Sequence, residues 1–150
     1  MKKIIILNGP NINKIGIREP KIYGNIDIND YLLNLKNKYI KKNIKLYIYN
    51  YNNEGKIIDF LYKIYKIKKK IFLIINLGAF THTSLAISDA IKIIKNKIYL
   101  IEVHVSNIFN REKIRNNSLI SSLTNGIIIG FGVFSYELAI ISIIKNKLFF

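Results

Sequence analysis

Short apolar runs alternate with longer mixed segments along this chain. The apolar runs predict five β-strands, at residues 3–7, 44–49, 71–75, 98–103 and 126–130. Apolar residues at helical spacing predict four long helices, at residues 27–42, 54–66, 84–95 and 134–147. Such alternation is typical of βα units around a parallel sheet. The pattern therefore predicts an α/β flavodoxin-like fold, a five-stranded parallel sheet with helices on both faces, and leaves the strand order open.

The same spacing predicts which helical residues face the core. In the first helix, which Asp27 caps, they are Ile28, Tyr31, Leu32, Leu35 and Tyr39. In the second they are Ile57, Ile58, Leu61, Tyr62 and Tyr65. In the third they are Leu85, Ile87, Ala90, Ile91 and Ile94, and in the last Leu138, Ile141 and Ile144.

Length and composition narrow the class of protein. We expect one domain over residues 1–150, which is long enough to bury a core without stabilising disulfides or metal ions. The absence of cysteine excludes disulfides and thiolate chemistry and agrees with a cytoplasmic location. The first apolar run stops at Asn8, too early for a signal peptide, and Ser135 and Glu137 interrupt the last one, so no membrane partner is expected.

A net charge of +15 normally raises the question of nucleic acid as a partner. However, Ile, Lys and Asn make up half of the chain, and 21 lysines stand against 3 arginines. We interpret the charge as a compositional drift, because phosphate-binding patches are more often clustered and contain arginine. A basic nucleic-acid-binding module stays open as an alternative, and salt-dependent retention on DNA would reveal it.

Polar residues follow the first, third and fourth predicted strands, where a ligand of such a sheet should lie. Glu102, His104 and Ser106 alternate, so an extended chain puts them on one face. With the charged run 111–115 they indicate a site for an anionic substrate, or else a strand end with a solvated loop. A nucleotide-binding protein of this fold is the other alternative, but Pro10 removes an amide donor from the loop that would cradle phosphate.

Four polar motifs recur in order along the chain. They are Leu7-Asn8-Gly9-Pro10-Asn11 with residues 16–24, the run 76–90, Glu102-Val103-His104-Val105-Ser106-Asn107 with Arg111 and Arg115, and Gly130-Phe131-Gly132 with Tyr136. Together they resemble type II 3-dehydroquinate dehydratase over nearly the whole chain. The resemblance implies a hydro-lyase of the shikimate pathway that converts 3-dehydroquinate to 3-dehydroshikimate through an enolate, with no cofactor and no metal. It also implies a homo-oligomer, a dodecamer built as a tetramer of trimers.

The resemblance also implies catalytic roles. Tyr23 would be the base, and Arg18 the cation that lowers the pKa of its phenol. His104 would be the general acid, and Glu102 would hold its tautomer and keep it protonated. Asn11 would organise the enolate oxygen.

For substrate binding, the resemblance implies that Asn76, Val105 and Ser106 hold the carboxylate. His82 and Arg115 would hold the ring hydroxyls, and Asp89 would reach a neighbouring subunit's site. The chain departs from the family pattern at a few positions that carry no catalytic role, namely Lys14, Tyr51, Leu77, Phe80 and Ser135.

Overall fold

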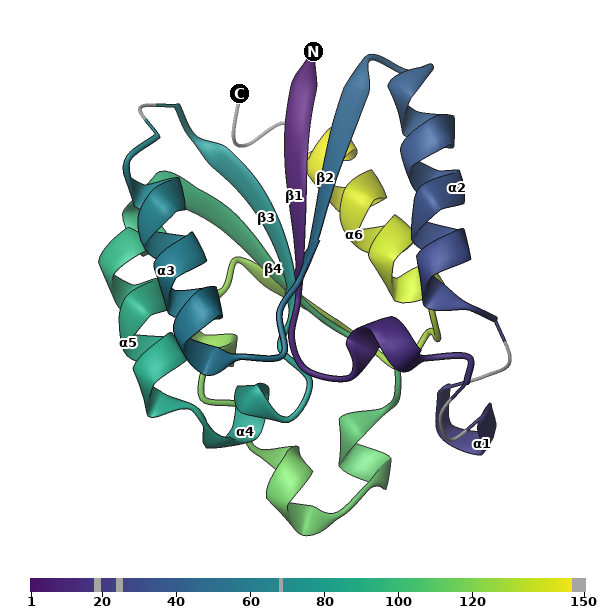
Figure 1. Cartoon of the computed structure of the whole chain (residues 1–150), viewed down its shortest axis with the longest axis vertical. Coiled ribbons are helices and arrows are strands. Elements are labelled where there is room, and N and C mark those ends of the chain that lie inside the picture. The colour runs from purple at the N-terminus through teal and green to yellow at the C-terminus, as the bar shows by residue number, and fades with distance from the viewer. Residues whose placement is uncertain (18–19, 24–25, 68, 147–150) are drawn as a thin grey trace.

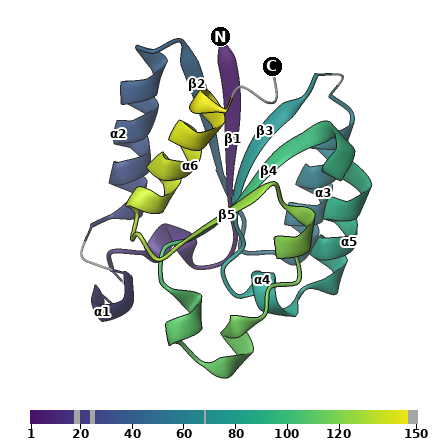
Figure 2. The same cartoon turned by 180° about the vertical axis from the view of Figure 1, so that it is seen from behind.

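Five parallel strands form one sheet in the computed structural model, which describes residues 1–17, 20–23, 26–67 and 69–146. The strands are β1 (Lys2–Asn8), β2 (Ile44–Asn50), β3 (Ile71–Asn76), β4 (Ile98–His104) and β5 (Gly126–Ile129). Their order is β2-β1-β3-β4-β5, with every neighbouring pair parallel (Figure 1; β5 is labelled in Figure 2). The predicted α/β class and flavodoxin-like sheet are confirmed.

Helices cover both faces of the sheet (Figures 1 and 2). They are α1 (Pro20–Tyr23), α2 (Ile28–Ile40), α3 (Glu54–Tyr65), α4 (Phe80–Thr83), α5 (Leu85–Ile94) and α6 (Phe134–Lys145). The core on one face includes residues of α2 and α6, and the core on the other includes residues of α3 and α5. Between β4 and β5 the chain forms three short 3-10 turns instead of a long helix. No helix in the described ranges is long and apolar enough to cross a membrane.

The predicted core faces are confirmed in part. In α2, Ile28, Leu32, Leu35 and Tyr39 are buried, and Asp27 caps the helix by accepting from the Asn29 amide at 2.7 Å.

The predicted face of α3 is wrong for its two tyrosines. Tyr62 and Tyr65 are exposed by 41% and 42%, while Ile64 is buried in their place. Their phenol ends reach the surface, where the Lys97 ammonium lies 4.0 Å from the Tyr65 ring centroid.

The predicted stripe of α6 is also wrong, because the helix is apolar on most of its circumference and spacing alone cannot choose a face. The buried apolar residues are Tyr136, Ala139, Ile140 and Ile143, whereas Leu138, Ile141 and Ile144 are only partly covered. In α5 the prediction fails at Leu85 alone, whose side chain is 67% exposed.

The register of the sheet brings the polar strand ends together. Asn8 at the end of β1 pairs with Asn76 at the end of β3, and Ile75 pairs with Glu102 of β4. The chain runs from β1 to β2 on one side and then crosses from β2 to β3 on the other side of β1. The strand order therefore reverses between β1 and β3, and a ligand crevice is expected at their carboxyl ends.

Candidate active site

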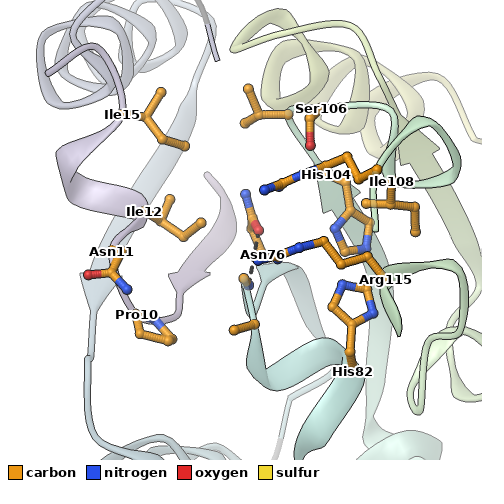
Figure 3. Close-up of a pocket in the computed structure, with 14 residues that line it drawn as sticks. Pro10, Asn11, Ile12, Ile15, Asn76, His82, His104, Ser106, Ile108 and Arg115 are labelled. Carbon is orange, nitrogen blue, oxygen red and sulfur yellow. Dashed lines mark hydrogen bonds between the residues drawn. The ribbon is translucent and has the colours of Figure 1, made fainter. Parts of the chain in front are cut away.

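A cavity of about 160 Å³ lies at the carboxyl ends of β1, β3 and β4 (Figure 3). Its lining residues are Pro10, Asn11, Ile12, Ile15, Asn76, Gly78, Ala79, His82, His104, Val105, Ser106, Ile108, Arg111 and Arg115. Amide, imidazole and guanidinium groups thus meet on one wall, opposite the apolar side chains of Ile12 and Ile15.

The loop after β1 reaches this cavity only because it can approach β3 closely. A Cβ atom on Gly9 would lie 2.3 Å from the carbonyl oxygen of Leu77, so any other residue there would push the two loops apart. The Gly9 amide donates to the Asn76 carbonyl at 2.8 Å. Asn11 then takes a left-handed conformation (φ 64°), which asparagine tolerates better than most residues.

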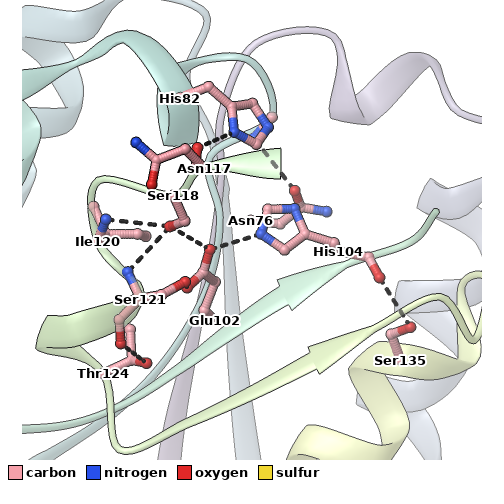
Figure 4. Close-up of polar contacts among 11 residues, drawn as sticks. Asn76, His82, Glu102, His104, Asn117, Ser118, Ile120, Ser121, Thr124 and Ser135 are labelled. Atoms are coloured by element: carbon pink, nitrogen blue, oxygen red, sulfur yellow. Dashed lines mark hydrogen bonds and ion pairs between the residues drawn. The ribbon is translucent and has the colours of Figure 1, made fainter. Parts of the chain in front are cut away.

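His104 and Glu102 form a buried pair on β4 (Figure 4). The His104 Nε2 atom lies 2.7 Å from Glu102 Oε1, and because a carboxylate only accepts, Nε2 donates its hydrogen. The two side chains are 5% and 1% exposed. His104 lines the cavity, so Nδ1 is the ring nitrogen left for a bound molecule.

Two hydroxyl groups complete the shell around the Glu102 carboxylate. Ser118 donates to Oε1 at 2.9 Å, and Ser121 donates to Oε2. Burial alone would raise the pKa of Glu102, but the hydrogen bonds from His104, Ser121 and Ser118 outweigh it and hold that pKa below its usual value. Glu102 is therefore an ionised anchor beneath the imidazole.

His82 lies beside His104, with the ring centroids 6.1 Å apart and the planes nearly parallel. Its Nδ1 donates to the Asn117 carbonyl at 2.8 Å. Burial lowers the pKa of His82, and the neighbouring His104 and Arg115 add to the effect. His82 therefore favours the neutral form, with Nε2 as an acceptor for a hydroxyl group.

Seven of the predicted site residues line the cavity together, namely Asn11, Asn76, His82, His104, Val105, Ser106 and Arg115. Glu102 lies behind His104. Asp89 lies outside the cavity of its own chain, exposed on α5 and paired with Lys92 at 2.8 Å. Arg18 and the side chain of Tyr23 fall outside the part of the chain that the structure describes, although Tyr23 ends α1.

Sequence reasoning missed several supporting residues. Arg111 also lines the cavity, and although it belongs to the third motif and the charged run, it was given no role. Ser118 and Ser121 lie 16 and 19 residues beyond Glu102, in a loop without a periodic pattern. Nothing in the spacing marks them as carboxylate partners.

The Glu102 shell predicts a specific response to acid. The Glu102→Gln variant should lower the free energy of unfolding at pH 7 by about 2 to 4 kcal/mol, because charge-assisted hydrogen bonds are lost in a buried site. A carboxyl with a lowered pKa stabilises the fold above its unfolded pKa of about 4.3 and loses that contribution as the pH falls through the folded value. Urea titrations should show the gap between wild type and variant narrowing below about pH 4. A gap that stays constant with pH would contradict the assignment.

The arrangement can donate a proton from an imidazole beside groups that bind anions and hydroxyls. Within the described ranges, no three His, Cys, Asp or Glu side chains cluster as a metal site would require. The chemistry that these residues support by themselves is general acid catalysis on an anionic, hydroxylated molecule.

Comparisons with known proteins agree with this arrangement. Residues 2–144 match the family model described as Dehydroquinase class II. A 3-dehydroquinate dehydratase of Prochlorococcus marinus is 46% identical over 145 residues, covering 96% of this chain and 95% of that protein. One from Buchnera aphidicola is 43% identical over 150 residues, covering 97% and 95%. The crystal structure of a type II dehydroquinase from Butyrivibrio crossotus superposes with a TM-score of 0.88 at 43% identity, covering 96% of this chain and 98% of that one. The resemblance predicted from the motifs is confirmed, and the chain belongs to the class II dehydroquinase family.

Proposed function

We propose that this chain dehydrates 3-dehydroquinate to 3-dehydroshikimate by anti elimination of water through an enolate, without a cofactor. The reaction belongs to the shikimate pathway, and the enzyme works in the cytoplasm. The observation that carries the proposal is the buried His104–Glu102 pair, which opens onto a cavity lined by Asn76 and Arg115. An acid of this kind is what the departing hydroxyl needs, and the polar wall suits a substrate with a carboxylate and ring hydroxyls.

His104 is the general acid in this proposal. Glu102 holds Nε2 and stabilises the imidazolium, so the proton for the leaving hydroxyl comes from Nδ1. The substrate carboxylate binds to Asn76, to the backbone amides of Val105 and Ser106 and to the Ser106 hydroxyl. His82 and Arg115 take the ring hydroxyls, and Asn11 organises the enolate oxygen through water.

Tyr23 is the base, and Arg18 lowers the pKa of its phenol so that the phenolate is accessible at neutral pH. Support comes from the place of α1. Its residues Lys21 and Ile22 share a second cavity, of about 410 Å³, with Ser106 and Arg111, which also line the first. The helix that ends at Tyr23 therefore borders the site.

The direct test is ultraviolet absorbance of the conjugated enone when purified protein meets 3-dehydroquinate. We expect a steady rise in absorbance that depends on enzyme concentration. No rise with correctly folded protein would refute the proposed activity.

We also propose assembly into a dodecamer, a tetramer of trimers, in which Asp89 reaches the site of a neighbouring subunit. The Asp89 side chain is 67% exposed on the outer side of α5. Large apolar residues are exposed as well, among them Ile93, Ile127, Phe131 and Phe134. Symmetric assembly would cover such surface.

The Asp89→Ala variant should lower turnover by about tenfold or more while leaving the free energy of unfolding of the chain within about 0.5 kcal/mol of wild type, as exposed substitutions usually do. The matched control is Asp59→Ala, which removes an exposed carboxylate from α3. Activity measured across the peak in analytical ultracentrifugation checks the link to assembly. A fully active monomer would refute it without touching the assignment of His104.

A further inference from the structure

Tyr136 of α6 is fully buried, and its hydroxyl lies between the ends of β1 and β3. It donates to Asn8 Oδ1 at 2.8 Å and accepts from Asn76 Nδ2 at 2.9 Å. Asn8 in turn donates from Nδ2 to Asn50 Oδ1 at 3.0 Å. A chain of hydrogen bonds thus runs from the edge strand β2 to the wall of the cavity.

This series of hydrogen bonds has a fixed direction because the phenol of Tyr136 has one hydrogen to donate. Asn8 donates to Asn50 through its amino group, so the Asn8 amide oxygen faces Tyr136 and accepts a hydrogen bond from the phenol. The Tyr136 oxygen is then left to accept from the Asn76 amino group. Burial raises the pKa of Tyr136, which keeps the phenol protonated and able to donate.

The consequence at Asn76 is a single orientation of its amide. The Oδ1 atom accepts from the Gly78 amide at 3.3 Å, and one Nδ2 hydrogen goes to Tyr136. Asn76 lines the cavity, so the other Nδ2 hydrogen is the one offered to a bound anion. A rotated amide would instead present an oxygen, which repels a carboxylate.

We propose that Tyr136 is a positioning residue for the substrate carboxylate, acting by locking the Asn76 amide with its amino group toward the cavity. The inference rests on the proposed function and assigns a part to a residue that does not itself line the site. Tyr136 contributes to binding through Asn76, whereas the proton transfers depend on other groups.

The test is a double-mutant cycle on Tyr136→Phe and Asn76→Ala. Tyr136→Phe should raise the KM for 3-dehydroquinate about tenfold, the equivalent of one hydrogen bond, with kcat within about twofold of wild type. In the Asn76→Ala background the same substitution should have almost no effect on KM, because the two residues act as one unit. Calorimetry with 3-dehydroshikimate should show a matching loss of affinity.

Tyr39→Phe is the control for a purely structural effect. Tyr39 is also buried, and its hydroxyl donates to Glu137 of the same helix α6 at 3.0 Å. This variant loosens α6 without touching Asn76, so its KM should stay at the wild-type value. An equal rise in KM for Tyr39→Phe, or additive effects in the cycle, would overturn the inference.

If Tyr136→Phe does not fold, the KM of Asn50→Ala tests the proposal instead. Asn50 is exposed, and its loss frees the Asn8 amide to rotate, so KM should rise in the same direction by a smaller factor. An unchanged KM in Asn50→Ala would then reject the proposal. Failure of the proposed function is a separate result, because wild-type protein would show no turnover of 3-dehydroquinate at all.

Discussion

Replacing His104 with alanine should lower kcat by about two to four orders of magnitude, the usual contribution of a positioned general acid. The imidazole lines the cavity and is held from behind by Glu102 at 2.7 Å, and alanine removes its Nδ1 donor altogether. Steady-state absorbance kinetics at saturating 3-dehydroquinate would measure the loss.

His82→Ala is the informative comparison for that variant. His82 stacks beside His104, but its Nδ1 is committed to the Asn117 carbonyl. Its loss should raise KM more than it lowers kcat. Near-normal kcat in His104→Ala, with protein shown to be folded by circular dichroism, would exclude His104 as the acid.

The Tyr23→Phe variant should lose turnover to a similar degree, because it removes the proposed base and leaves the ring. An ordinary phenol has a pKa near 10, so the reaction at neutral pH depends on the cation proposed beside it. The pH dependence of kcat/KM would locate the pKa of that group in the free enzyme.

Tyr62→Phe provides the control, since Tyr62 is an exposed tyrosine on α3 that does not line the cavity. It should retain wild-type kinetics. Retained turnover in Tyr23→Phe would mean that another group abstracts the proton.

Sequence periodicity predicted the sheet and the helices because the apolar runs are short and well separated. It failed where nearly all positions are apolar, as in α6, and where an aromatic ring can lie at the surface, as with Tyr65. The wall formed by Asn76 and His104 could be predicted because parallel strands end at one edge. The hydrogen-bond partners of Ser118 and Tyr136 could not, because contacts over such sequence distances depend on how loops and helices pack.

The turns between β4 and β5 have a consequence for local unfolding. This segment supplies the Asn117 carbonyl to His82 and the serine hydroxyls to Glu102, and its Leu119 amide donates to the Thr81 carbonyl at 2.9 Å. Short turns of this kind open at a lower free energy than the central strands. One opening event would remove the Asn117 carbonyl from His82 and both serine hydroxyls from Glu102. Mild denaturant should therefore abolish catalysis while amide protons of the sheet still resist exchange with solvent.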